Sequence, residues 1–282
     1  MPAGRGEGDE GRVRDGADLG GAAPGTGFDE EGTAGMSRDE AIGRARDSSP
    51  SLLRWIWDWT KTIATAILIF MFIRAFVVEA FQIPTGSMEN TLLVGDFLLV
   101  NKAAYGAEVP GTRLRLPAFE QPHRGDVVVF QPPPAAGQSP STRYVKRIVG
   151  VPGDTLSMHE GKLFLDGGRV KESYVKHIRP YRDPSNPSFR WQRHYLVKPA
   201  RAAGGYRPTR DNWGPIVVPR GRYFVMGDNR DNSEDSRYWG FVPRDAIRGK
   251  PLIVYYSYRE RSSAVVPWLT QIRWGRFLTP IH

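Results

Sequence analysis

The most apolar stretch of the chain lies near its N-terminal end and predicts a membrane-spanning helix. Its strictly uncharged run, Thr62 to Ile73, is shorter than the roughly 20 residues that a spanning helix needs. Tryptophans upstream of the run suit a membrane interface, and Lys61 and Arg74 can extend their charged ends into water. We therefore expect a transmembrane anchor and its flank over residues 52–78. The alternative is a buried helix of a soluble protein.

The charges beside the anchor predict its orientation. Arg54 and Lys61 precede the apolar run, and no Lys or Arg follows Arg74 until Lys102. This bias places the N-terminus inside and the rest of the chain outside. The first 48 residues are rich in Gly, Ala and charged residues, which predicts a disordered tail because little apolar surface is available to bury.

Beyond the anchor, the apolar pattern changes to short segments that are typical of β-strands. These segments are rich in Val, Ile, Tyr and Phe, and clusters of Pro and Gly separate them. No repeat and no alternation of strands with helices is present, so the pattern predicts an all-β class. Residues 159–220 are more polar and are interrupted by prolines, which predicts an insertion beside a core. The expected strands include 96–102, 126–130, 142–151, 222–228 and 251–258.

Composition narrows the chemistry. The chain has no cysteine, which excludes disulfides, a cysteine nucleophile and cysteine-ligated metal centres. Its net charge is +9, but the basic residues are interleaved with acidic ones and form no block or motif, so a nucleic-acid partner is not expected. The five histidines lack the spacing of metal ligands, and we expect no metal and no cofactor.

The stretch "IPTGSMENTL", residues 83–92, offers a candidate nucleophile a few residues after the anchor. Gly86 allows a close backbone approach to a substrate, and Ser87 follows it. The Thr85 hydroxyl can lie on the same side as the Ser87 backbone N–H, and two donors aimed at one point form an oxyanion hole. An ordinary Pro-Thr-Gly-Ser turn is the alternative, which these residues alone favour.

A candidate base lies in "RYVKRIVG", residues 143–150. Alternate residues of a strand share a face, so Lys146 lies between Tyr144 and Ile148 on one face. Burial would lower the pKa of this lysine and allow it to act as a general base. The alternative is an exposed lysine on an edge strand.

The segment "GDNRDNSEDSRYWGFVP", residues 227–243, predicts a polar network. Its spacing does not match a calcium loop. Ser233 can form a hydrogen bond with a lysine, and Asp235 can pair with Arg237. The Arg-Gly-Asp sequence at 124–126 leads into a predicted strand and therefore indicates a turn rather than an adhesion signal.

The order of these motifs resembles that of bacterial type I signal peptidase, a membrane-bound Ser/Lys protease that removes signal peptides from exported proteins. The resemblance covers about residues 52–258 and matches poorly at 159–220. Two positions depart from the family pattern, because Ala80 and Asn90 stand where proline is common. The motifs that carry the resemblance are "FQIPTGSM", "GDFLLVNK", "RGDVVVF", "RYVKRIVGVPGD" and "GDNRDNSEDSRYWG".

The resemblance implies a role for each matching residue. Ser87 is the expected nucleophile and Lys146 the general base, with Thr85 and Ser87 forming the oxyanion hole. Ser233 orients the lysine, supported by Asp235 and Arg237. Ile83, Met88 and Leu92 are expected to form an apolar floor for the substrate and to contact lipid as well. The positions that match substrate-pocket residues are Phe81, Ile83, Pro84, Met88, Leu92, Tyr144 and Val145.

The resemblance also implies the organisation of the chain. We expect a mainly antiparallel, two-domain β fold: a cytoplasmic tail (1–48), an anchor (52–78), a catalytic core (79–158 and 221–258) interrupted by a cap (159–220), and a C-terminal tail (259–282). The protein would be a monomer in the bacterial plasma membrane, with its catalytic domain outside the cytoplasm and signal peptides and the lipid bilayer as partners. Two alternatives are a self-cleaving Ser/Lys repressor, which would lack an anchor, and an anchored adhesin that uses the Arg-Gly-Asp turn.

Overall fold

The N-terminal helix of the computed structural model has the length expected of a membrane anchor. The structure describes residues 51–112, 114–139, 141–178, 183–198, 200, 205–260 and 264–282, so the predicted disordered tail (1–48) lies outside the described residues. Helix α2, Leu52–Phe76, has 25 residues, or about 37 Å at 1.5 Å per residue. It is long and apolar enough to cross a membrane, and none of its residues is buried in the protein. A buried helix of a soluble protein does not fit this exposure.

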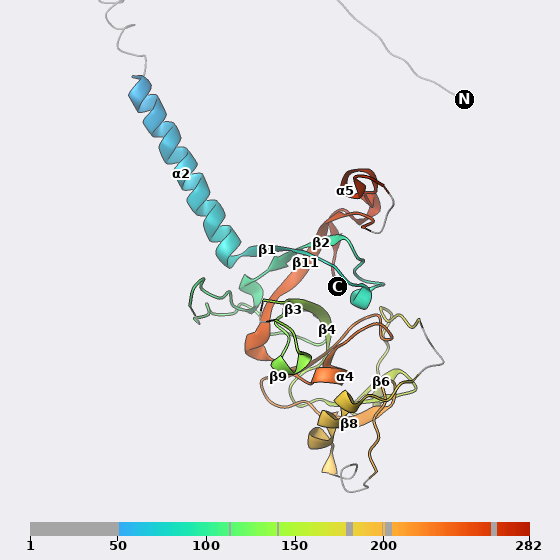
Figure 1. Cartoon of the computed structure of the whole chain (residues 1–282). Helices are drawn as coiled ribbons and strands as arrows, with labels where there is room; N and C mark the ends of the chain where they lie inside the picture. The colour runs from blue at the N-terminus through green and yellow to red at the C-terminus, as the bar shows by residue number, and fades with distance from the viewer. Residues whose placement is uncertain are drawn as a thin grey trace, which may run out of the picture. The chain divides into compact units, whose positions relative to one another are not determined.

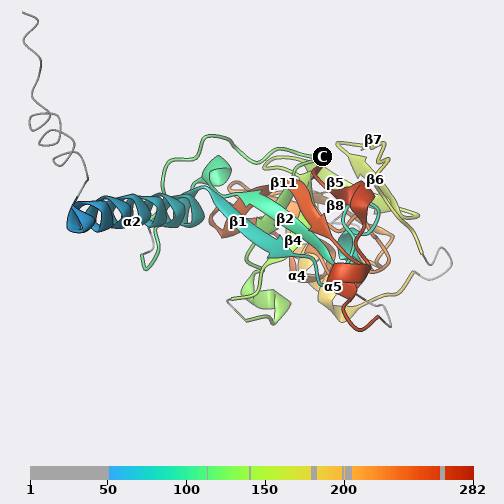
Figure 2. The same ribbon diagram turned by 90° about the horizontal axis from the view of Figure 1, so that it is seen from above.

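A large antiparallel sheet follows the helix. Within the described residues it has eight strands, in the order β1-β2-β11-β3-β4-β9-β10, with β12 paired to β11. Strands β1, β2 and β11 lie side by side in both ribbon views (Figures 1 and 2). The strand bounds are β1 Val78–Gln82, β2 Asp96–Asn101, β3 Val127–Phe130, β4 Tyr144–Gly150, β9 Arg222–Met226, β10 Val242–Pro243, β11 Ile247–Ser257 and β12 Thr279–Pro280.

A smaller sheet is formed by four strands in the order β7-β6-β5-β8, counted over the described residues. Asp166 and Gly167 connect β6 to β7, and both have positive φ angles (49° and 85°), as a tight hairpin turn requires. All strand pairs of both sheets are antiparallel, so the predicted fold class is confirmed. The bounds are β5 Thr155–His159, β6 Lys162–Leu165, β7 Gly168–Arg169 and β8 Trp213–Val217.

Short helical segments join the strands. Those that matter for the site are η1, which follows β1, and α4, which follows β9. The bounds are η1 Gly86–Met88, η2 Ala103–Tyr105, η3 Pro134–Ala136, η4 Pro187–Tyr195, α4 Ser236–Trp239, η5 Arg244–Ala246, α5 Pro267–Thr270 and η6 Trp274–Arg276.

Strands in the middle of the large sheet explain two features of the sequence. The four residues of β3 are all buried, which fits an unbroken apolar run covered on both faces. Strand β11 contains Pro251, although proline cannot donate a ladder hydrogen bond. The register of β11 against β2 shifts directly after Pro251, so the proline occupies an irregularity of the ladder.

The segment that carries the candidate nucleophile rests on an apolar core. Ile83, Met88 and Leu92 are at most 4% exposed and pack in one cluster with Leu98 and Val129. The expectation that these three side chains contact lipid is therefore wrong, because they fill the space between the 83–92 segment and the sheet. Their burial fixes the backbone on either side of Ser87.

The C-terminal segment is fastened to the large sheet through one buried carboxylate. Asp96, which is fully buried, accepts hydrogen bonds from Ser257 Oγ (2.6 Å) and from Arg276 Nε (3.0 Å). Strand β12 pairs with β11, and the Arg273 N–H donates to the Ser257 carbonyl (2.9 Å). The C-terminal segment is thus held to β11 by strand β12 and to the start of β2 by Asp96.

Candidate active site

Ser87 lies in a turn that breaks away from the large sheet. Strand β1 ends at Gln82, and the Ile83 N–H still bonds to the Asp96 carbonyl (2.8 Å). Pro84 then has no N–H to continue the ladder, and the chain turns into η1, Gly86–Met88. Met88 is the buried end of this turn, and Ser87 is half-buried.

The turn ends in a backbone conformation that excludes proline. Asn90 has a φ of 105°, and its side-chain amide donates to the Tyr174 carbonyl (3.0 Å). Proline is locked near a φ of −65°, whereas asparagine tolerates positive values better than most residues. The departure from the family pattern at this position therefore matches the local geometry.

Lys146 reaches Ser87 from strand β4. Its Nζ lies 2.7 Å from Ser87 Oγ and donates to the Val145 carbonyl at 3.1 Å. The residue is 4% exposed, and its Nζ is 5.3 Å from the centre of the Tyr144 ring. Burial lowers the pKa of Lys146 to about 8, although the carboxylates of Asp235 and Asp228 act in the opposite direction.

Thr85 lies on the same side of the turn as the serine hydroxyl. Its Oγ1 is 3.4 Å from Ser87 Oγ, and the residue is exposed. The Thr85 hydroxyl can therefore rotate toward the carbonyl oxygen of a substrate bound at Ser87. This position is compatible with a donor to a developing oxyanion.

Residues 227–229 hold the serine turn against the sheet. The Asn229 N–H donates to the Ser87 carbonyl (3.1 Å), and the Asn229 side-chain amide donates to the Gly86 carbonyl (3.0 Å). A Cβ at Gly227 would lie 2.5 Å from the Ser87 carbonyl oxygen and 2.3 Å from Ser233 Oγ. Only glycine fits here, so the two backbone segments can approach closely.

Asp235 and Arg237 form the buried pair that the sequence predicted. Both are fully buried, and Arg237 Nε donates to Asp235 Oδ1 at 2.8 Å. Burial alone would raise the pKa of Asp235, but Arg237 and the N–H of Gly227 outweigh it and hold the pKa below its usual range. The pair fixes the backbone at Gly227 and, through it, the Ser87 turn.

Ser233 lies in the same cavity, but its contacts differ from the expected ones. No hydrogen bond joins its Oγ to Lys146 Nζ in the described structure, and this buried hydroxyl has no partner within hydrogen-bond geometry there. It is near enough to Asp235 to help lower the pKa of that carboxyl. The second polar contact of Lys146 is instead the carbonyl of Val145.

Residues that the sequence did not mark as functional also support the site. Arg147, adjacent to Lys146, is buried and pairs with Asp228 at 2.8 Å. Asp228 also accepts from the Thr91 hydroxyl (2.5 Å), and so connects β4 to the 83–92 segment. The dense polar motif at 227–243 was a signal for Asp228 and Asn229, whereas the depth of Arg147 had no signal in the sequence.

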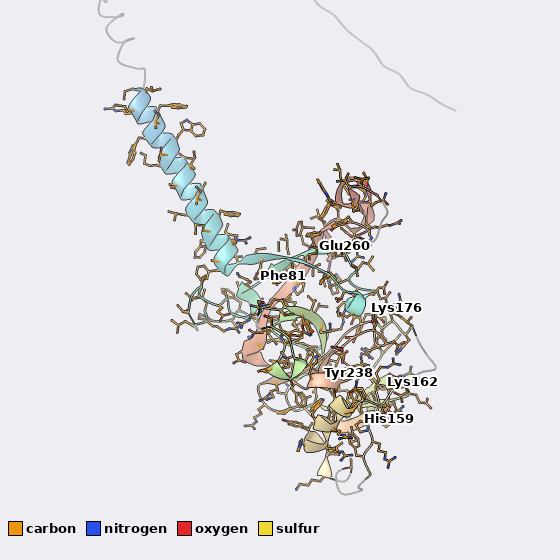
Figure 3. The ribbon with its side chains drawn as sticks, in the orientation of Figure 1. Phe81, His159, Lys162, Lys176, Tyr238 and Glu260 are labelled. Carbon is orange, nitrogen blue, oxygen red and sulfur yellow. The ribbon has the colours of Figure 1, made fainter. Side chains whose placement is uncertain are left out.

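The candidate residues line one cavity of about 800 Å³. Phe81 on β1 and Tyr238 on α4, both labelled in Figure 3, contribute to its wall. Leu92 is absent from the wall because it is fully buried in the core beneath. The predicted residues that the cavity brings together are Phe81, Ile83, Pro84, Thr85, Ser87, Met88, Tyr144, Val145, Lys146 and Ser233.

Comparison with known proteins gives a consistent result. The family model for signal peptidase, peptidase S26, matches residues 56–256. Signal peptidase I of Pseudomonas aeruginosa is 34% identical over 252 residues, covering 83% of this chain and 83% of that protein. Signal peptidase I of Pseudomonas fluorescens is 37% identical over 227 residues (76% and 78%), and that of Aquifex aeolicus is 35% identical over 222 residues (68% and 80%).

A β fold with a serine, a buried lysine and a substrate-sized cavity is compatible with a hydrolase, and the comparisons define which one. The chain belongs to the peptidase S26 family of signal peptidases. The resemblance to bacterial type I signal peptidase is thus confirmed, and the protein is a protease. Together with the apolar helix α2, the family membership identifies a membrane-anchored enzyme.

The buried amine predicts a pH-dependent stability. The pKa of Lys146 is about 8 in the folded chain and about 10.4 when unfolded, which corresponds to about 3 kcal/mol. Between these values the unfolded chain binds more protons, so the free energy of unfolding should rise with pH from about 8 to about 10.4. Below pH 8 Lys146 is charged in both states, so the cost of burying its charge lowers the free energy of unfolding in full. In Lys146→Met this contribution should be missing.

Urea unfolding of both full-length proteins in detergent, at a series of pH values, tests this expectation. The difference between the two curves isolates Lys146 from other groups that titrate at alkaline pH. If the free energies of unfolding of the two proteins changed with pH in parallel, the Lys146 ammonium would be well solvated or paired with a carboxylate in the folded protein.

Gly227→Ala should disable the site without removing any functional group. The added Cβ would displace either the Ser87 carbonyl or Ser233, since both lie within 2.5 Å of it. We expect a loss of proteolytic activity by at least about tenfold, because small displacements of catalytic groups are costly. Gly275→Ala is the control, since no atom lies within 4 Å of its Cβ position and its φ angle is not positive. Equal activity of both variants with wild type would contradict the close packing at Gly227.

Proposed function

We propose that this protein is a membrane-bound serine endopeptidase that removes signal peptides from exported pre-proteins at the outer face of the plasma membrane. The observation that carries the proposal is the 2.7 Å contact between Lys146 Nζ and Ser87 Oγ inside the cavity. A lysine with a lowered pKa beside a hydroxyl is the arrangement that activates a serine nucleophile.

The proposed reaction has two halves. Neutral Lys146 takes the proton from Ser87 Oγ as the oxygen attacks the scissile carbonyl, and the Ser87 N–H and Thr85 hydroxyl stabilise the resulting oxyanion. The protonated lysine then gives its proton to the leaving amine, which leaves an acyl-enzyme ester on Ser87. Water, deprotonated by Lys146, attacks the ester and releases the signal peptide.

The position of Ser87 along the chain supports cleavage near a membrane. Ser87 follows the last residue of α2, Phe76, by eleven residues. Eleven residues reach at most about 40 Å when fully extended, so the nucleophile stays close to the point where the anchor ends. The bias of Arg and Lys toward the start of the anchor supports an outer location of the catalytic domain.

The two alternative functions are less well supported. A self-cleaving repressor would not need an apolar helix of 25 residues. The Arg-Gly-Asp turn of an adhesin would have to present its side chains to a partner protein. Here Arg124 forms an ion pair with Asp154 (2.7 Å), and Asp126 accepts a hydrogen bond from the Tyr105 hydroxyl (2.9 Å). The charged side chains of this turn therefore make contacts within the protein itself.

Replacing the nucleophile tests the function directly. Ser87→Ala should abolish cleavage of a peptide that has small residues one and three positions before the bond, such as Ala-x-Ala. Ser139→Ala, on an exposed loop, should retain full activity. Peptides with Phe or Arg at those positions should be poor substrates, because we expect Ile83, Tyr144 and Val145, which line the cavity, to form only shallow apolar pockets. An active Ser87→Ala protein would remove the basis of the proposal.

The lysine base predicts the pH profile. Since only neutral Lys146 accepts the proton, kcat/KM should rise with pH along a limb centred near 8 and fall about tenfold per unit below it. Lys146→Arg should be inactive, because a guanidinium stays protonated in this range. Chelators should have no effect. An active arginine variant, or a limb near pH 6.5 that indicates histidine, would assign the base elsewhere.

The oxyanion role of Thr85 predicts an asymmetric response to substitution. Thr85→Ala should lower kcat by about 10²–10³-fold, since it removes one of two donors. Thr85→Ser keeps the hydroxyl and should retain most of the activity. Equal rates for the alanine and serine variants would show that the second donor is another group.

A further inference from the structure

A second cavity lies beside the C-terminal end of helix α2. It has a volume of about 300 Å³, and Ala75 of the helix is part of its wall. The loop at 108–112 forms another part of the wall. This volume is at the lower end of the range for ligand pockets and suits a headgroup rather than a large molecule.

Positive charge dominates this cavity. Its wall contains the cations Lys102, Arg115, Arg143 and Arg248 against two carboxylates. Glu79 lies 3.7 Å from Lys102 and Glu108 pairs with Arg248, so the carboxylates leave an excess of two positive charges. The wall is therefore better suited to an anion than to a neutral or cationic ligand.

The arginines repel one another where they meet. Burial and the charge of Arg248 lower the pKa of both Arg115 and Arg143. The Arg115 guanidinium donates to the Ile247 carbonyl (2.9 Å), a neutral acceptor, and Arg248 Nε is buried without a hydrogen-bond partner in the described structure. A bound anion would relieve the repulsion between these guanidinium groups.

The place of the cavity indicates the source of the anion. The last turn of α2 contains Arg74, whose carbonyl accepts a hydrogen bond from Lys102 Nζ (3.0 Å). The end of a spanning helix lies at the depth of the lipid headgroups, where the phosphates are found. Lys102 and Ala75 thus bring the cavity to that depth.

We propose that this cavity binds the phosphate of an anionic phospholipid headgroup at the membrane surface. Arg143 lines both this cavity and the one that contains Ser87. The bound lipid would therefore lie next to the active-site cleft and help to fix the depth at which the cleft meets the bilayer. This inference concerns lipid recognition and goes beyond the proposed proteolytic function.

The test uses the full-length protein in neutral detergent and follows its thermal unfolding midpoint. Short-chain phosphatidylglycerol should raise the midpoint in a saturable manner, whereas short-chain phosphatidylcholine should not, because a ligand of the folded state stabilises it. In Arg115→Gln/Arg248→Gln the apparent affinity for phosphatidylglycerol should fall by at least about tenfold. The control Arg169→Gln/Arg222→Gln has the same charge change at two exposed positions and should bind normally.

The outcomes separate the sources of the anion. Inorganic phosphate that stabilises as well as phosphatidylglycerol would replace the lipid by a free ion and overturn the proposal, as would an acidic peptide that binds in its place. Equal losses in the cavity and control variants would indicate diffuse charge and overturn it as well. Lys102→Gln, whose fold is checked by its midpoint without lipid, provides a second variant if the double substitution unfolds.

Discussion

A buried amine at the wall of the cavity is the constraint around which this protein is built. Lys146 lies within a sheet, next to Ser87, and its burial depresses its pKa to about 8. A charged group in a buried position destabilises the fold, so the packing around Lys146 must hold the side chain beside Ser87. Strand β4 provides the backbone, and the apolar cluster below Met88 provides the floor.

The groups that keep the site in position are themselves buried and charged. Asp235 with Arg237, and Arg147 with Asp228, are almost completely removed from solvent. Such pairs add little net stability compared with apolar residues of similar size, but removal of one partner is strongly destabilising. Their value here is geometric: through Gly227 and Asn229 they fix the carbonyls of Gly86 and Ser87.

The sequence was sufficient to predict the anchor and the β class for a physical reason in each case, whereas the residues of the cavity followed from the resemblance to type I signal peptidase. Apolar run length indicates a membrane helix, and short β-branched segments between glycines and prolines indicate strands. Leu92 could not be placed, because an apolar residue near a site can equally line the cavity or lie beneath it. The hydrogen-bond partner of Ser233 could not be predicted from the sequence either, since it depends on sub-ångström geometry. Arg147 gave no sign of its depth because its partner, Asp228, is 81 residues away.

The fastening of the C-terminal segment to Asp96 has a consequence for how the protein forms. Arg276 meets Asp96 across 180 residues of chain, and β11 separates β2 from β3 in the sheet. Contacts of such high sequence separation are slow to form, because a long loop must close first. The large sheet therefore cannot be completed until nearly the whole chain has been synthesised. Until then β2 and β3 each have one unpaired edge, and an unpaired strand edge is a site at which chains can aggregate.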